Sequence, residues 1–255
     1  MIARSLTLTA LAGLPLIRPG DDLPALLVAA LRDMQVDLRD KDVLVVAQKI
    51  ISKAEDRIVD LKKVAPSSRA TAIASEVNKD ARLVEVILSE TDEIIRKQRD
   101  VLIVADVRGF VMANAGVDQS NVAGEDSDQV LLLPKDPDAS AAALKAALDR
   151  AFDADVGVVI NDSFGRPWRQ GVVGVAIGAA GLPSLRNMVD VPDIFGRKMR
   201  VTEIAVADEI AAAASLVMGQ GAERQPAVLV RGLDWDAPAT PASVLLRPKH
   251  TDLFR

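Results

Sequence analysis

The stretch Val156–Gly181, VGVVINDSFGRPWRQGVVGVAIGAAG, decides how the fold is interpreted. Its opening apolar run is typical of a buried strand, and the run stops abruptly at Asn161, Asp162 and Ser163. We therefore expect Asp162 and Ser163 at the tip of a strand, where carboxylate and hydroxyl oxygens are suited to Mg²⁺ or Mn²⁺. The alternative is an ordinary exit from a strand into a loop, and the stretch alone favours neither.

The second half of this stretch is rich in glycine but matches no nucleotide-binding fingerprint. The glycines at 171, 174, 178 and 181 do not form G-x-G-x-x-G, and the chain contains no G-x-x-x-x-G-K-[ST]. A Rossmann or P-loop site is thus not indicated, and we expect the glycines to permit close backbone packing behind the strand tip. Arg166 and Arg169 are suited to gripping a carboxylate or a phosphate, although solvated arginines in a loop would give the same pattern.

The composition of the 255-residue chain limits the possible chemistry. A hydrophobic content of 49% with 26% charged residues indicates an ordinary globular protein, and a net charge of −5 gives no reason to expect nucleic acid. With no cysteine and a single histidine, His250, a thiolate zinc site, a multi-histidine metal site and a Ser-His-Asp triad are not expected. Any divalent metal should then have oxygen ligands, and a reducing, cytoplasmic compartment is predicted. No run of about 18 apolar residues occurs, so no membrane span or membrane partner is expected.

Hydrophobic periodicity and turn signals predict an α+β (mixed α/β) fold. Strands are expected at 5–10, 42–48, 100–106, 109–116, 129–134, 156–162 and 226–233. Helices are expected at 21–35, 67–80, 81–98 and 140–152, and segment 200–221 should start extended and become a helix that stops at Gly219. Ser52 is expected in a polar turn. We predict one domain over 1–235, with room for two subdomains and an inserted antiparallel part near 100–185, followed by a C-terminal extension over 236–255.

Three further segments are suited to binding chemistry. ANAGVDQSN (113–121) places Asp118 and Asn121 on a loop after an apolar strand, where they could bind a ligand or form an Asx-type turn. MGQGAERQP (218–226) follows a long helix, so Gly219 should be its left-handed C-cap, while the flexible turn around Gln220 could cradle phosphate. AQKIISKAE (47–55) carries Lys49 and Lys53 four residues apart, either to pair with phosphates or to decorate the start of a helix.

Taken together, the segments from Gly13 to about Leu233 resemble the coenzyme F420-0:L-glutamate ligase family. The resemblance rests on GLPLI, VLVVAQKIISKAEDRI, ANAGVDQSNV, INDSFGRPWRQGVVGVAIGAAGL, VADEIAAAASLVMGQG and PAVLVRGL, which occur in this order. It implies a family-specific fold that is neither P-loop nor Rossmann and an intertwined homodimer. It also implies a GTP-dependent enzyme that uses Mg²⁺ or Mn²⁺, with K⁺ as a further candidate ion, to join L-glutamate to F420-0 through an acyl phosphate. Some relatives carry a C-terminal nitroreductase-like domain, which is not expected here.

The resemblance also implies roles for individual residues. Asp118 and Asp162 match metal-binding aspartates, Ser163 stands where the family often has threonine, and Gln220 matches the position that serves a second metal. Asp118 and Asp162, with Lys53, form the implied catalytic group, and Arg166 and Arg169 are candidates for holding glutamate or the substrate's phosphodiester. The implied nucleotide contacts are Leu14, Pro15, Leu16, Ile17, Gln48, Lys49, Lys53, Asn121, Met218, Gly219, Gln220, Gly221, Ala222, Glu223, Arg224 and Gln225.

One departure from the family pattern and two other functions stay open at this point. Gln48 and Lys49 differ from the small hydroxyl residues of some relatives, although an extra lysine near phosphate is electrostatically sensible. The same carboxylates would also suit a metal-dependent phosphohydrolase acting on a phosphate ester, or a GTP-binding regulatory protein without turnover.

Overall fold

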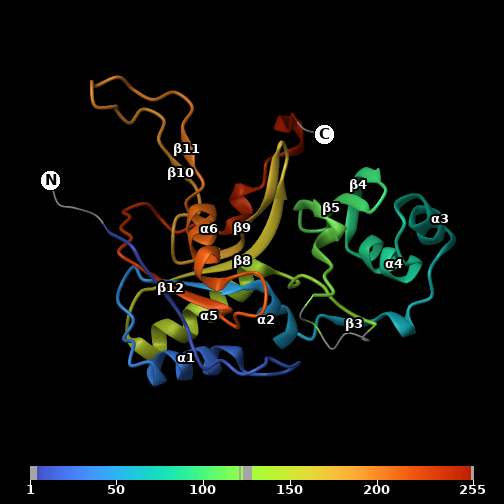
Figure 1. Cartoon of the computed structure of the whole chain (residues 1–255). Coiled ribbons are helices and arrows are strands. Elements are labelled where there is room, and N and C mark those ends of the chain that lie inside the picture. Colours follow the sequence, from blue (N-terminus) through green and yellow to red (C-terminus); the bar gives the residue numbers. More distant parts are fainter. Residues whose placement is uncertain (1–4, 121, 123–127, 254–255) are drawn as a thin grey trace.

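A five-stranded sheet organises the larger part of the molecule (Figure 1). The computed structural model describes residues 5–120, 122 and 128–253. The strands follow the order β1 (Thr7–Ala10), β12 (Ala227–Arg231), β2 (Val43–Ala47), β8 (Gly157–Arg166) and β9 (Arg169–Ala180). β2 and β8 are parallel, and the other neighbours in this sheet are antiparallel. The carboxyl end of β2 therefore lies beside Asn161 of β8.

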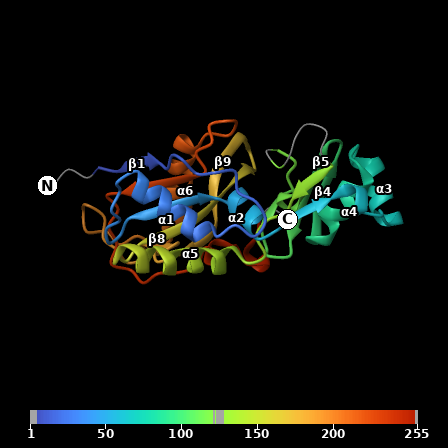
Figure 2. The same ribbon diagram turned by 90° about the horizontal axis from the view of Figure 1, so that it is seen from below.

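Helices cover both faces of this sheet. α1 (Leu23–Asp33) and α5 (Pro137–Phe152) lie on one face and α6 (Val206–Met218) on the other, as Figures 1 and 2 show from two directions. The alternation of a strand explains both cores: Leu44 and Val46 of β2 pack with α1 and α5, whereas Val43 and Val45 pack with α6. A strand buried on both faces needs a continuous apolar run, which β2 supplies.

Residues 58–132, which follow α2 (Gln48–Ala54) and precede α5 in the chain, form a smaller lobe to one side of the large sheet (Figure 1). Its elements are β3 (Ile58–Asp60), α3 (Ser68–Val77), α4 (Ala81–Ser89), β4 (Thr91–Gln98), β5 (Val101–Asp106), β6 (Val111–Ala113) and β7 (Gln129–Leu131), with 3₁₀ turns η1 (Leu61–Lys63) and η2 (Asn114–Gly116). The antiparallel sheet β4-β5-β6 and the pair β3-β7 enclose a separate apolar core with α3 and α4. Within the lobe, Glu90 accepts hydrogen bonds from Arg57 at 2.8 Å and Arg108 at 2.7 Å, a largely buried ion-pair network.

The mixed α and β composition is confirmed, but several predicted boundaries are wrong. The helix expected over 81–98 ends at Ser89, because Thr91–Gln98 pairs with β5 as strand β4. Strand pairing, a long-range contact, overrides the helical spacing of these residues. The strand expected at 129–134 forms only over Gln129–Leu131, and this strand, β7, pairs with β3 instead of the preceding strands. The antiparallel three-stranded sheet occupies 91–113, while β8 and β9 belong to the large sheet.

Two peripheral segments complete the structure. Residues 186–204 form a long protruding hairpin based on β10 (Arg186–Asn187) and β11 (Glu203–Ile204) (Figure 1). The segment after Gly232 contacts α5 and the smaller lobe: the Asp138 carboxylate of α5 accepts from the backbone N–H of Ala242 at 2.8 Å, and Lys249 pairs with Asp92 of β4 at 3.2 Å. Among the described helices, none has the length and apolar character needed to cross a membrane.

Gly174 and Gly178 of β9 let the helices approach this strand closely, which confirms the packing role predicted for them, whereas a Cβ on Gly171 would meet nothing within 4 Å. A Cβ added to Gly174 would lie 2.1 Å from the Ser215 Oγ of α6, and a Cβ on Gly178 would lie 2.3 Å from the Pro137 carbonyl oxygen of α5. Real Cβ contacts are essentially never below 3.0 Å. The β9 backbone is therefore in direct contact with helices on both sides.

This packing predicts the effect of a single added methyl group. Gly178→Ala should lower the free energy of unfolding by about 1–3 kcal/mol, since the clash is with backbone that cannot turn away. Gly165→Ala, where the added Cβ meets nothing within 4 Å, is the matched control and should change stability by less than about 0.5 kcal/mol. Urea denaturation measures both, and equal effects for the two variants would contradict the packing role.

Candidate active site

Asp162 lies where β8 continues beyond its parallel partner β2. The last pair in their register is Ala47 with Asn161, and β8 then runs on to Arg166 as a two-stranded ribbon with β9. The predicted strand tip at Asp162 and Ser163 is therefore wrong, because β9 satisfies the backbone hydrogen bonds of this segment. The polar change in sequence instead marks where β8 leaves the middle of the sheet. Alternation along the strand then directs Asp162 and Ser163 to opposite faces.

The helix α2 begins directly after β2 and brings two polar residues to Asp162. Its first residues are Gln48, which is 2% exposed, and Lys49. The pKa of Asp162 is raised to about 6, chiefly by burial. The charge of nearby Asp118 contributes to this rise, while the backbone N–H of Ser163, the charge of Lys49 and the Gln48 side chain oppose it. Ser52, predicted in a turn, instead lies fully buried within α2.

Asp118 comes to the same place from the smaller lobe. Its backbone bridges to Leu131 of β7, with N···O distances of 3.0 and 2.8 Å. Its carboxylate forms an ion pair with the Lys49 Nζ at 2.7 Å and accepts hydrogen bonds from the Ser120 N–H at 2.8 Å and hydroxyl at 2.9 Å. Burial alone would raise the pKa of Asp118, but Lys49 and Ser120 hold it below its ordinary value. The predicted Asx-type turn is present, and the same carboxylate faces a cation.

Ser163 and Gln220 meet on the other side of β8. The Ser163 hydroxyl donates to the Gln220 Oε1 at 2.9 Å. Gln220 follows the end of α6 at Gly219, whose φ of 72° and ψ of −178° differ from the left-handed helical cap that was predicted. Glu223 explains this conformation, since it accepts from the Gly221 N–H at 2.7 Å and its Cδ lies 2.2 Å from any Cβ placed on Gly219. The loop thus folds around Glu223 and presents Gln220 to the strand.

The remaining predicted nucleotide contacts lie in different environments. Lys53 lies one helical turn after Lys49, and its pKa is lowered by burial and by the charge of Lys49. Segment 14–17 is irregular, with Ile17 buried and Leu16 exposed. Asn121 lies outside the described residues, so its predicted nucleotide contact has no structural account.

The two arginines of the opening motif lie at the far end of the ribbon. Arg166 and Arg169 pair across the turn between β8 and β9, and the Arg166 guanidinium donates to the Gln170 carbonyl at 3.1 Å. Four residues of extended strand separate Arg166 from Asp162, about 13 Å along the chain. The structure therefore does not bring these arginines into the acidic cluster.

Two serines of the site were missed by sequence reasoning. Ser120 holds Asp118 and Ser52 holds Gln48, the latter through a hydrogen bond of 2.8 Å from its hydroxyl to the Gln48 Oε1. Their spacing in the sequence could have indicated both roles. Ser120 stands two residues after Asp118, as in an Asx turn, and Ser52 stands four residues after Gln48, one turn along a helix.

The donor set suits a hard divalent cation. Asp118 and Asp162 supply carboxylate oxygens on one side of β8, and Ser163 with Gln220 supplies a hydroxyl and a carboxamide oxygen on the other. Mg²⁺ and Mn²⁺ accept all of these ligand types. Within 5–120, 122 and 128–253, no three acidic, histidine or cysteine residues gather as a metal site. A metal held by Asp118 and Asp162 would thus have two carboxylate ligands.

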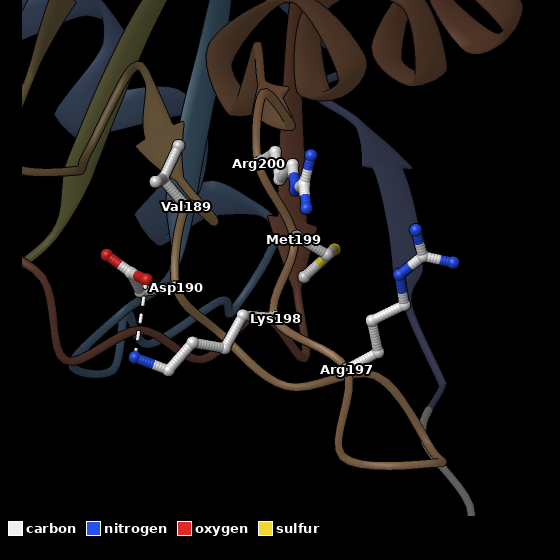
Figure 3. A pocket seen from close by; sticks show the side chains of 6 residues that line it. All are labelled: Val189, Asp190, Arg197, Lys198, Met199 and Arg200. Carbon is white, nitrogen blue, oxygen red and sulfur yellow. Dashed lines mark hydrogen bonds and ion pairs between the residues drawn. The ribbon is translucent and has the colours of Figure 1, made fainter.

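A separate hollow lies in the protruding hairpin (Figure 3). It is lined by Val189, Asp190, Arg197, Lys198, Met199 and Arg200. The Lys198 ammonium pairs with Asp190 at 3.3 Å, as the dashed line in Figure 3 marks. None of these residues belongs to the acidic cluster, and the carboxylate that lines the hollow, Asp190, is already paired with Lys198.

Fold and site together define a class: an α+β protein with an oxygen-rich, lysine-flanked acidic site at the carboxyl end of a parallel strand pair. The family model described as F420-0:Gamma-glutamyl ligase matches residues 13–232. The chain belongs to this family.

Relatives named coenzyme F420:L-glutamate ligase support the assignment over the whole length. The protein of Methanothermobacter thermautotrophicus is 44% identical over 252 residues, which cover 98% of this chain and 99% of the relative. The protein of Natronomonas pharaonis is 44% identical with coverage of 96% and 93%, and that of Archaeoglobus fulgidus is 44% identical with coverage of 87% and 86%.

The burial of Asp162 predicts a dependence of stability on pH. Because the pKa of Asp162 is raised in the folded state, its ionisation lowers the free energy of unfolding of the metal-free protein, and this loss is complete above about pH 6. The loss disappears below about pH 4, where the carboxyl is protonated in both the folded and the unfolded state. Asp162→Asn should therefore raise the free energy of unfolding at pH 8 by about 1–3 kcal/mol in the presence of a chelator. Urea denaturation from pH 4 to 8 measures this, and an advantage that stays constant or grows on acidification would contradict the assignment.

Proposed function

We propose that this protein is a GTP-dependent ligase that joins L-glutamate to F420-0 through a γ-glutamyl-type amide bond in coenzyme F420 biosynthesis. The observation that carries the proposal is the meeting of Asp118, Lys49 and Asp162, with 2.7 Å between Lys49 and Asp118, inside the region that matches the ligase family. The names of the relatives support the acceptor and the amino acid. GTP as the phosphoryl donor follows from the family resemblance.

The acidic site would hold Mg²⁺ or Mn²⁺ next to the phosphates of GTP. Asp118 and Asp162 are its anionic ligands, and Ser163 and Gln220, on the other side of β8, are candidate ligands of a second ion. A bound ion would offset the charge of the phosphates. K⁺ is a candidate additional ion.

The nucleotide would lie across the residues around this site. Lys53, one turn from Lys49, adds positive charge for the phosphates. The proposed contacts to GTP are Leu14, Pro15, Leu16, Ile17, Lys49, Asn121 and the loop 218–225. Arg166 and Arg169 remain candidates for the carboxylate of glutamate or the phosphodiester of F420-0, reached along the ribbon.

The reaction requires two successive bond exchanges. The terminal carboxylate of F420-0 attacks the γ-phosphorus of GTP, which gives an acyl phosphate and GDP. The amine of glutamate then attacks the acyl carbon, the C–N bond forms, and phosphate and a proton leave. The protein's part is to hold the reacting groups in line and to offset charge, which is the main source of catalysis in phosphoryl transfer.

The proposal includes a homodimer in the cytoplasm. The protruding hairpin exposes Ile194, Phe195 and Val201, with exposed fractions of 92%, 89% and 86%. Three large apolar side chains exposed on one projecting element are suited to a protein–protein contact. A second copy of the chain is the occupant that the family resemblance supports.

Phosphate release is the test that separates the ligase from its two alternatives. A ligase releases phosphate from GTP only when both F420-0 and glutamate are present, and mass spectrometry finds the glutamylated product. A phosphohydrolase would release phosphate without glutamate. A regulatory protein would bind GTP and release none.

The proposal predicts the result of removing one metal-binding carboxylate. Asp162→Ala should lower turnover by at least about 100-fold, since the charge that offsets the phosphates is lost, while circular dichroism shows an intact fold. Asp33→Ala, at the exposed end of α1, is the control and should keep full activity. Wild-type turnover of Asp162→Ala at saturating Mg²⁺ would remove Asp162 from the mechanism.

A further inference from the structure

Gln48 has almost no surface with which to touch a nucleotide. Its exposed fraction is 2%, and Ser52 beside it is fully buried. A buried carboxamide is costly unless both of its ends are hydrogen-bonded. The contacts of Gln48 therefore indicate what it does, and they are contacts within the protein.

The orientation of the Gln48 carboxamide is fixed by Ser52. The Ser52 hydroxyl donates to the Gln48 Oε1 at 2.8 Å, so the oxygen end is occupied and the NH₂ end is left to donate. That end is left to face the Asp162 carboxylate, which as an anion only accepts, and Gln48 lowers the pKa of this carboxyl. The result is a directed chain from Ser52 through Gln48 to Asp162.

The backbone explains why these residues meet. Ala47 and Asn161 are paired in the parallel register of β2 and β8, so the next residues, Gln48 at the start of α2 and Asp162 within β8, lie side by side. Ser52 lies one helical turn later in α2, on the same side of the helix as Gln48. The three interacting residues Ser52, Gln48 and Asp162 therefore all lie in a helix or a strand, and none of them lies in a loop.

We propose that Gln48, oriented by Ser52, is a positioning residue that holds the Asp162 carboxylate in place for a divalent metal. This inference rests on the proposed function, and it replaces the nucleotide contact that the family pattern assigns to Gln48. Residues that hydrogen-bond a ligating carboxylate orient it, and their loss typically lowers metal affinity about 10- to 100-fold. Lys49, the next residue of α2, holds Asp118 in the same way through its ion pair.

The test is Mn²⁺ affinity of the full-length protein without nucleotide, measured by electron paramagnetic resonance of free Mn²⁺. Gln48→Met, which keeps the shape but removes the amide, should weaken Mn²⁺ binding about tenfold or more. Ser52→Ala should weaken it less, and should add nothing when Gln48 is already methionine, because the two act in series. Gln98→Leu and Ser75→Ala, at exposed positions, are the matched controls.

The outcomes separate this inference from the proposed function. Unchanged Mn²⁺ affinity in folded Gln48→Met, or weaker GTP binding with unchanged Mn²⁺ affinity, would overturn the positioning role and restore the nucleotide contact. Additive losses in the double variant would also overturn it. If Gln48→Met fails to fold, the Mn²⁺ affinity of Ser52→Ala is compared with that of Ser75→Ala, and equal affinities would overturn the positioning role. A wild-type protein that binds no Mn²⁺ at all would remove the proposed metal site itself, and the inference with it.

Discussion

The structure depends on how two neighbouring carboxylates are accommodated at the carboxyl end of the β2–β8 pair. Asp162 and Asp118 repel each other, and burial makes the charge of Asp162 costly. Lys49 offsets this by pairing with Asp118 at 2.7 Å and lowering the pKa of both acids. Asp118 is kept ionised, while Asp162 is left with a pKa of about 6. A site of this kind is prepared for added positive charge and is not optimised for stability.

The long connection between the two parallel strands brings the parts of this site together. After β2 the chain forms α2, builds the whole smaller lobe, and returns through α5 to β8. The lobe contributes Asp118, which the backbone bridge to Leu131 holds against α2. α6 adds Gln220 from the opposite face of the sheet. Four segments distant in sequence therefore converge, and each is held by an element whose core packing is independent of the site.

Local patterns predicted the parts of the structure that local forces determine. The buried strand β2, the helix before Gly219 and the packing role of the β9 glycines follow from apolar runs, periodicity and residue size. Which strands pair with one another did not follow from these local patterns. Thr91–Gln98 has helical spacing but is held as β4 by β5, and β8 continues past Asp162 because β9 pairs with it. The sequence indicated Asp118, Asp162, Ser163 and Gln220, but not that Lys49 and Gln48 each serve one aspartate, because the register of β2 and β8 sets that arrangement.

Anomalous diffraction from crystals grown with Mn²⁺ and a non-hydrolysable GTP analogue tests the central claim most directly. The account predicts a manganese peak within coordination distance of the Asp118 and Asp162 carboxylates, with the analogue's phosphates beside it and Gln48 still bound to Asp162 and Ser52. Manganese and analogue at a place that touches neither aspartate would contradict it.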